Sequence, residues 1–149
     1  MKDVRKEIKH NDVIYPLVFN LNVMEQIQLQ YGSVEKWGDL TDGTFNGKKE
    51  YEKKNGEDSW ELLTEDEKIA KRGEPDAQAI IFGFKEMINE GLDMDNEILV
   101  AKGEKPRPEL TLKQAGRLIT AIGLDFATKK LQETVVESQK VEGIDSKNE

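Results

Sequence analysis

The residues that could support acid–base or metal chemistry are numerous but of few kinds. The chain has one histidine, His10, and no cysteine, which excludes disulfides, thiolate zinc sites and cysteine nucleophiles. Its 30 aspartates and glutamates allow many carboxylate pairs, but solvated helix faces explain most such pairs. We therefore predict no catalytic residue and no cofactor. An enzyme with an unrecognised carboxylate site stays open as an alternative.

Two stretches approach the spacing of a calcium-binding loop, which needs acidic ligands at fixed places and a glycine at the sharp turn. In the first, Ile98 stands where that glycine belongs; in the second, Lys53 replaces the bidentate glutamate. We favour helix capping and turn chemistry for both stretches and predict no metal site. The acidic and polar positions are Asp93, Asp95, Glu97 and Glu104 in the first, and Asp42, Thr44, Asn46 and Gly47 in the second.

The stretch "GTFNGKK" has part of the pattern of a phosphate-binding loop, with Gly43, Gly47 and Lys48. It is one residue short, lacks the serine or threonine that would bind magnesium, and follows no strong buried strand. A polar loop is the favoured interpretation.

The composition limits the classes of partner. At 149 residues the chain suits one domain, and its net charge of -8 argues against nonspecific binding to nucleic acid. The N-terminus "MKDVRKEIKH" has no apolar signal core, and no apolar run approaches the roughly 18 residues that a membrane span requires. We expect a cytoplasmic protein that binds neither nucleic acid nor membrane. Negative charge discourages self-association, which is left open.

The N-terminal elements follow from a change of hydrophobic period. "VRKEIKHNDVIYPLVF" predicts two short strands around a turn at His10-Asn11-Asp12, with Pro16 on an edge strand because it lacks an N–H. Asn20 is expected to cap a helix that ends at Gly32. Ser33 is expected to cap the short helix that follows, through "VEKW". From residue 38 to 74 the sequence is polar and contains several glycines. We expect most of it to be loop, with a short helix from the Thr64 capping box to Gly73.

The later helices are marked by apolar stripes and caps. A core helix is predicted from Pro75 to Gly91, with a short helix over 96–102 and an extended connection behind it. Thr111 and Gln114 predict a capping box that opens a helix ending at Gly123. A last helix is expected from about Asp125.

These elements predict a mostly α fold: a small N-terminal β-hairpin followed by a compact helical domain with a polar central insertion. We assign a single domain to residues 1–137, the insertion to 41–74 and a flexible tail to 138–149.

The predicted partner-binding surface is the apolar helix from Ala77 to Ile88 with part of the first helix. Plain core packing is the alternative for these side chains. Trp37 and Trp60 flank the polar segment, and we favour packing over partner anchoring for both. The candidate partner-binding residues are Met24, Ile27, Ile80, Ile81, Phe84 and Ile88.

Four stretches between Tyr15 and Thr120 resemble, in order, the tail assembly chaperones of long-tailed, siphovirus-like phages and prophages of Gram-positive bacteria. They are "YPLVFNLNVMEQIQLQYGSVEKW", the apolar "DAQAIIFGFKEMINEGLD", the charged connection "EKPRP" and the late helix "LTLKQAGRLIT". The polar segment from about Thr41 to Glu74 departs from the family's compact pattern, so no surface residue is carried over.

The resemblance implies a nonenzymatic chaperone that binds the tape measure protein while the tail tube protein polymerises around it. It also implies action in the cytoplasm of a bacterial host. Two other protein-binding roles are alternatives: a permanent structural component of a phage tail, and an intracellular adaptor.

Overall fold

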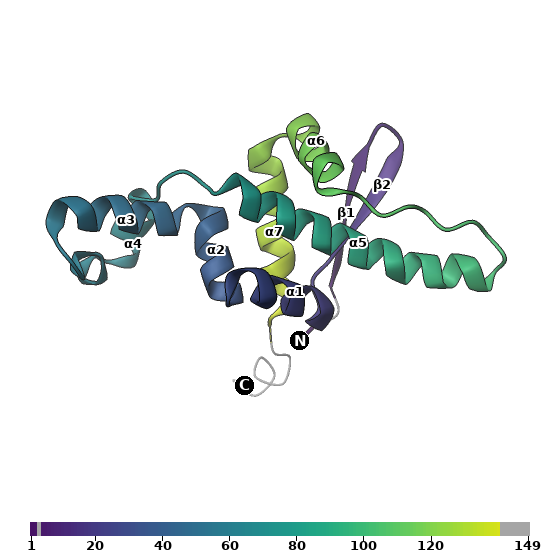
Figure 1. Ribbon diagram of the computed structural model, residues 1–149, viewed down its shortest axis with the longest axis horizontal. Helices are drawn as coiled ribbons and strands as arrows, with labels where there is room; N and C mark the ends of the chain where they lie inside the picture. Colours follow the sequence, from purple (N-terminus) through teal and green to yellow (C-terminus); the bar gives the residue numbers. More distant parts are fainter. Residues whose placement is uncertain (3, 141–149) are drawn as a thin grey trace, which may run out of the picture. The chain divides into compact units, whose positions relative to one another are not determined.

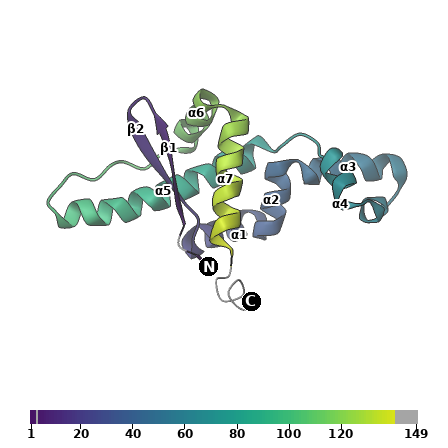
Figure 2. The same ribbon diagram turned by 180° about the vertical axis from the view of Figure 1, so that it is seen from behind.

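The computed structural model describes residues 1–2 and 4–140 (Figures 1 and 2). Its two strands form one antiparallel hairpin, and seven α-helices and a short 3-10 helix follow. The mostly α fold class with an N-terminal hairpin is thereby confirmed. The elements are β1 Arg5–His10, β2 Val13–Val18, α1 Leu21–Tyr31, α2 Val34–Asp42, α3 Thr44–Asn55, η1 Ser59–Leu62, α4 Glu65–Ala70, α5 Ala77–Ala101, α6 Leu112–Ile122 and α7 Leu124–Ser138.

The chain divides into two compact units. The first consists of Met1–Gln26 with Ile81–Glu149, and the second of Ile27–Ile80. The second unit therefore contains the whole polar segment 41–74 and extends beyond it on both sides. The tail predicted over 138–149 lies almost entirely outside the described residues, because α7 continues to Ser138 and residues 141–149 are not described.

The hairpin turns where the sequence predicts. Asn11 and Asp12 both have positive φ, 50° and 64°, which two-residue turns between right-twisted strands require. The register pairs His10 with Val13 and Ile8 with Tyr15. The next helix, α1, is capped as expected, because the Asn20 side-chain oxygen accepts hydrogen bonds from the backbone N–H groups of Asn22 and Val23.

In the first unit the hairpin packs against α5 on one face and α7 on the other. On the α5 face, Arg5 forms a two-pronged hydrogen bond with Asp95, at 2.8 and 2.9 Å. On the other face, Lys6 pairs with Glu137 of α7 at 3.0 Å. Ile8 follows Lys6 by two residues, so it lies on the same face of β1, and it is buried. Both views show α7 crossing α5 beside the hairpin (Figures 1 and 2).

Helix α5 corrects the prediction of a helix ending at Gly91 and a separate one over 96–102. It is one helix of 25 residues, and Gly91 lies inside it. A Cβ on Gly91 would come within 2.7 Å of the Pro16 side chain, so the glycine serves close packing against β2. The helix ends at Ala101, and Gly103, two residues later, has a φ of 78°.

The connection from α5 to α6 is extended, as predicted, and two asparagines of α5 fix its course. Asn96 donates to the Arg107 carbonyl and accepts from the Arg107 N–H, both at 2.8 Å. Asn89 makes the same pair of bonds with Leu110, at 2.9 and 2.8 Å. The asparagines are seven residues apart, so they share one face of the helix. An extended chain outside a sheet has no neighbouring strand for its backbone N–H and C=O groups to bond. Here each asparagine amide supplies the missing hydrogen-bond partner.

The second unit corrects the prediction that residues 38–74 are mostly loop. They form the end of α2, all of α3, then η1 and α4, and only short connections separate them. Ser33 caps α2 and Thr64 forms the predicted capping box with Glu67, but α4 ends at Ala70 rather than Gly73. A polar sequence can be helical because lysine and glutamate are good helix formers whose charges stay in water.

Glycine contacts and two tryptophans hold the second unit together. The Gly73 N–H donates to the Gly43 carbonyl at 2.8 Å, and a Cβ on Gly73 would lie 2.9 Å from the Gly47 nitrogen. Trp37 is buried, and its indole N–H donates to the Ala79 carbonyl at 2.9 Å. Trp60 is also buried and meets Tyr51 edge to face, with ring centroids 6.0 Å apart. Burial of both tryptophans confirms the packing interpretation.

The last two helices follow the predicted caps. Thr111 and Gln114 form a complete capping box at the start of α6, and Gly123, with a φ of 101°, separates α6 from α7. Helix α7, expected from about Asp125, begins at Leu124 and buries Ala127, Leu131 and Val135.

Candidate interaction surfaces

Four of the six predicted partner-binding residues lie in the core. Ile27, Phe84 and Ile88 are 0% exposed, and Ile80 is 1% exposed. Met24 and Ile81 are half-buried. Because a partner reaches only accessible atoms, the burial supports the packing alternative for the four core residues. A role in partner binding stays a prediction for Met24 and Ile81.

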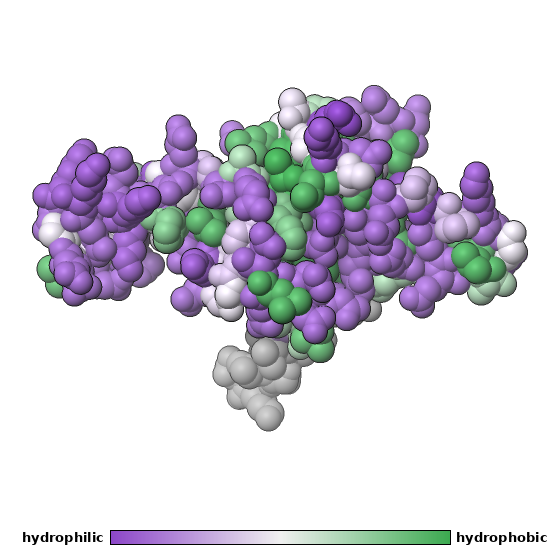
Figure 3. All heavy atoms as spheres, in the orientation of Figure 1, coloured by the Kyte–Doolittle hydropathy of each residue, from purple (hydrophilic) through white to green (hydrophobic). Residues whose placement is uncertain are grey.

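An apolar row runs along the accessible side of α6 in the first unit. Leu112 is 49% exposed, and Gly116, one turn later, is half-buried beside Ile81 of α5. A Cβ on Gly116 would lie 3.5 Å from Ile81 Cδ1, so these two helices meet closely. Figure 3 shows apolar residues gathered where α6 lies beside α5, with hydrophilic residues around them.

A basic row lies next to the apolar row. Lys113 and Arg117 are four residues apart on α6 and are both exposed. Neither forms an ion pair with a described residue. The stretch from Thr111 to Gly123 contains no acidic residue. We call Leu112, Gly116 and Ile81 with Lys113 and Arg117 the α6 surface; it is apolar and locally positive within an acidic chain.

The second unit carries a surface of the opposite charge. Between residues 57 and 67 there are six acidic residues (57, 58, 61, 65, 66 and 67) and no basic one. Leu62, at the end of η1, is 87% exposed, and Ile69 in α4 is 53% exposed. Glu65 and Asp66 precede Ile69 by four and three residues, so the three side chains share one side of α4. We call Leu62, Glu65, Asp66 and Ile69 the acidic segment.

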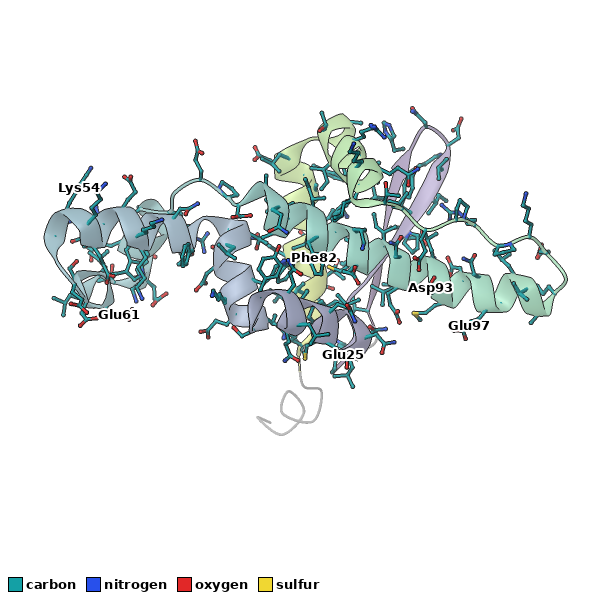
Figure 4. The ribbon with its side chains drawn as sticks, viewed as in Figure 1. Glu25, Lys54, Glu61, Phe82, Asp93 and Glu97 are labelled. Atoms are coloured by element: carbon teal, nitrogen blue, oxygen red, sulfur yellow. The ribbon has the colours of Figure 1, made fainter. Side chains whose placement is uncertain are left out.

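An acidic hollow of about 300 Å³ lies between α1, α5 and the extended connection in the first unit. Glu25, Glu86, Glu90, Asp93 and Glu109 line it with one cation, Lys85. Figure 4 shows Glu25 on α1 and Asp93 on α5. A hydrogen bond with Asp93, in which protonated Glu109 is the donor, and then partial burial raise the pKa of Glu109 above its ordinary 4.5. The carboxyl groups of Asp93 and Glu109 are both exposed, so they can share a proton but exchange it freely with water.

The stretches with partial calcium-loop and phosphate-loop spacing are built differently from such loops. Asp93 and Glu97 are four residues apart on one side of α5, whereas Asp95 lies on the other side. Asp95 is held by Arg5, which lowers the pKa of this carboxyl. Lys48 lies in α3 and pairs with Glu61 at 3.5 Å. Over residues 1–2 and 4–140, no three histidine, cysteine, aspartate or glutamate side chains are grouped so that they could hold a metal ion. None of the described helices is long and apolar enough to cross a bilayer.

Sequence reasoning missed both the α6 surface and the asparagine pair. The first was missed because helical spacing groups Leu112 with Ala115 and Ile119 on one inward face, whereas in the structure Leu112 is 49% exposed and the other two are buried. For the second, the seven-residue spacing of Asn89 and Asn96 before a proline-containing connection was available in the sequence. No protein-family model, curated protein or solved structure matches this chain.

Proposed function

We propose that this chain is a tail assembly chaperone of a long-tailed phage or prophage of a Gram-positive bacterium. It acts in the host cytoplasm and without catalysis: it binds the tape measure protein, assists assembly of the tail tube and leaves. One observation carries the proposal, namely the order of four stretches that resemble this family, from the hairpin and capped first helix to the late helix that Thr111 opens.

The surface chemistry of the chain is compatible with reversible protein binding. Half-exposed apolar side chains such as Leu112 and Ile81 can lie against the apolar stripe of a helical partner. Charged residues surround them, and charge at the rim of an interface favours fast, selective and reversible association over permanent burial. A chaperone that must release its partner needs this balance.

The proposal is tested by what binds the chain during tail assembly. The chain carries an affinity tag in its native host, the phage genes are induced, and mass spectrometry identifies the proteins that co-purify. Purified particles from the same culture are compared with the assembly lysate. We expect tape measure and tube proteins in the lysate complex and no copy of this chain in the particles.

Other outcomes would redirect the proposal. Presence in particles at a fixed ratio to the tube protein would identify a permanent tail component. A complex that contains host proteins and no tail protein would favour an intracellular adaptor and refute the tail role.

A further inference from the structure

We propose that copies of this chain associate head to tail, with the acidic segment of one copy docked on the α6 surface of the next. This interaction is additional to the proposed chaperone function and does not depend on it. The two surfaces belong to different units of the chain, so each copy supplies one of each.

The first step is the apolar content of the two surfaces. Leu62 is 87% exposed, which places nearly a whole leucine side chain in water with no packing role in its own unit. On the α6 surface, Leu112 is 49% exposed, and Gly116 beside it has no side chain to fill the space next to Ile81. An apolar side chain such as Leu62 is stabilised when it moves from water into contact with such a row.

The second step is charge, which determines what kind of partner docks on the α6 surface. The α6 surface contributes Lys113 and Arg117, which form no ion pair with any residue of 1–2 and 4–140, and no acidic residue lies between Thr111 and Gly123. The acidic segment contributes Glu65 and Asp66 from the first turn of α4. Both surfaces place a charged pair beside an apolar residue, with opposite signs. A second copy therefore supplies the complementary partner, although the net charge of -8 repels copies at long range.

The third step is symmetry. Head-to-tail docking of two different surfaces is a heterologous contact and leaves one free surface at each end, whereas reciprocal docking of both surfaces would close a two-fold dimer. Head-to-tail contacts produce open chains or closed rings rather than a symmetric dimer. The species formed should therefore grow with protein concentration and pass beyond two copies.

The experiment uses the full chain in sedimentation velocity over a wide range of concentration. Two variants each remove one surface: Leu62→Ser with Glu65→Lys, and Lys113→Glu with Arg117→Glu. All four positions are exposed, so the fold should persist, and far-UV circular dichroism checks it. Each variant alone should raise the dissociation constant by about tenfold or more, which corresponds to the loss of one well-packed contact.

The decisive measurement mixes the two variants. The first retains the α6 surface and the second retains the acidic segment, so the mixture should form one-to-one dimers that grow no further. Leu29→Ser is the matched control: Leu29 is 75% exposed and lies on neither surface, so association should be unchanged.

Four results would overturn the proposal. One is a wild-type chain that stays monomeric at every concentration. Another is a wild-type assembly that stops at a dimer, which indicates a reciprocal, symmetric interface. The third is association that responds to Leu29→Ser as strongly as to the surface variants. The fourth is a mixture of the two variants that stays monomeric.

Discussion

The two units are stabilised in different ways. The first has a core of large aliphatic and aromatic side chains, among them Phe84, Met87 and Leu131, all 0% exposed. In the second, Trp60 is the one fully buried large apolar side chain between residues 38 and 76, a stretch that is described throughout. In this stretch, close backbone contacts at Gly43, Gly47 and Gly73 hold the segments together, where an apolar stripe of side chains would otherwise do so. A chain segment without hydrophobic periodicity can therefore still fold when glycines let backbones meet.

The largest expected effect is in the core of the first unit. Phe84→Ala should lower the free energy of unfolding by about 3–5 kcal/mol, because it leaves a cavity that the packed helices cannot close. Urea unfolding followed by circular dichroism measures it. Phe126→Ala is the control: Phe126 is 46% exposed, so the change should stay within about 0.5 kcal/mol. Equal losses for both variants would refute the assigned core.

A pair of glycines tests the backbone packing of the second unit. Gly47→Ala should destabilise by about 1–3 kcal/mol, because the new Cβ would overlap the backbone of Lys71 and lie 2.9 Å from Arg72 Cα. Gly38→Ala has open space around its Cβ and lies in α2, so it should stabilise by up to about 1 kcal/mol through helix propensity. Thermal unfolding of both variants gives the comparison. A neutral Gly47→Ala would contradict the close approach of α3 to residues 71–73.

The asparagine pair offers a smaller, local test in the first unit. Asn96→Ala removes both hydrogen bonds to Arg107, and we expect a loss of about 1–2 kcal/mol. Hydrogen exchange at the Arg107 amide should become faster. Asn96→Asp keeps the acceptor oxygen and should preserve more of that protection. Unchanged exchange in Asn96→Ala would show that proline stiffness, rather than the side chain, fixes the connection.

The smallest effects concern two carboxyl contacts in the first unit with opposite dependence on pH. Arg5 lowers the pKa of Asp95 below 3.8, so this pair stabilises the fold above that pH and its contribution is lost as pH falls through the lowered pKa. The pKa of Glu109 is raised above 4.5, so its contact with Asp93 stabilises below 4.5 and is lost as pH rises through the raised pKa. Each effect should be about 1 kcal/mol or less because both pairs are exposed.

Unfolding measured between neutral pH and pH 3 separates the two contacts. Asp95→Asn should flatten the fall in stability at the acidic end. Glu109→Gln should remove the gain in stability that appears as pH falls through the raised pKa of Glu109. A Glu109→Gln profile that matches wild type would count against the shared proton.

Local sequence signals predicted the elements whose causes are themselves local. The Asn11-Asp12 turn, the Asn20 cap and the capping boxes at Thr64 and Thr111 each depend on residues within a few positions of one another. The α3 helix was missed, and the end of α4 was placed at Gly73 instead of Ala70, because the contacts that fix this part of the chain join residues far apart in sequence, such as Gly43 with Gly73. The end of α5 was misplaced for the same reason, since Gly91 packs against Pro16 rather than stopping the helix.

The candidate surfaces show the same division. Sequence periodicity correctly marked Phe84 and Ile88 as an apolar face, but periodicity does not distinguish a face that other helices cover from one that a partner covers. Exposure of Leu62 and Leu112 could be read only from the folded chain.

The sequence alone determined the fold class, the hairpin turn and the caps, because backbone preference and side-chain capping act over a few residues. It also determined the charge balance and the absence of cysteine chemistry. The tertiary structure decided the division into two units, the course of the 102–110 connection and the exposed apolar residues. These three features depend on which residues distant in sequence come together. Burial is therefore a property of the whole folded chain and not of any single stretch of sequence.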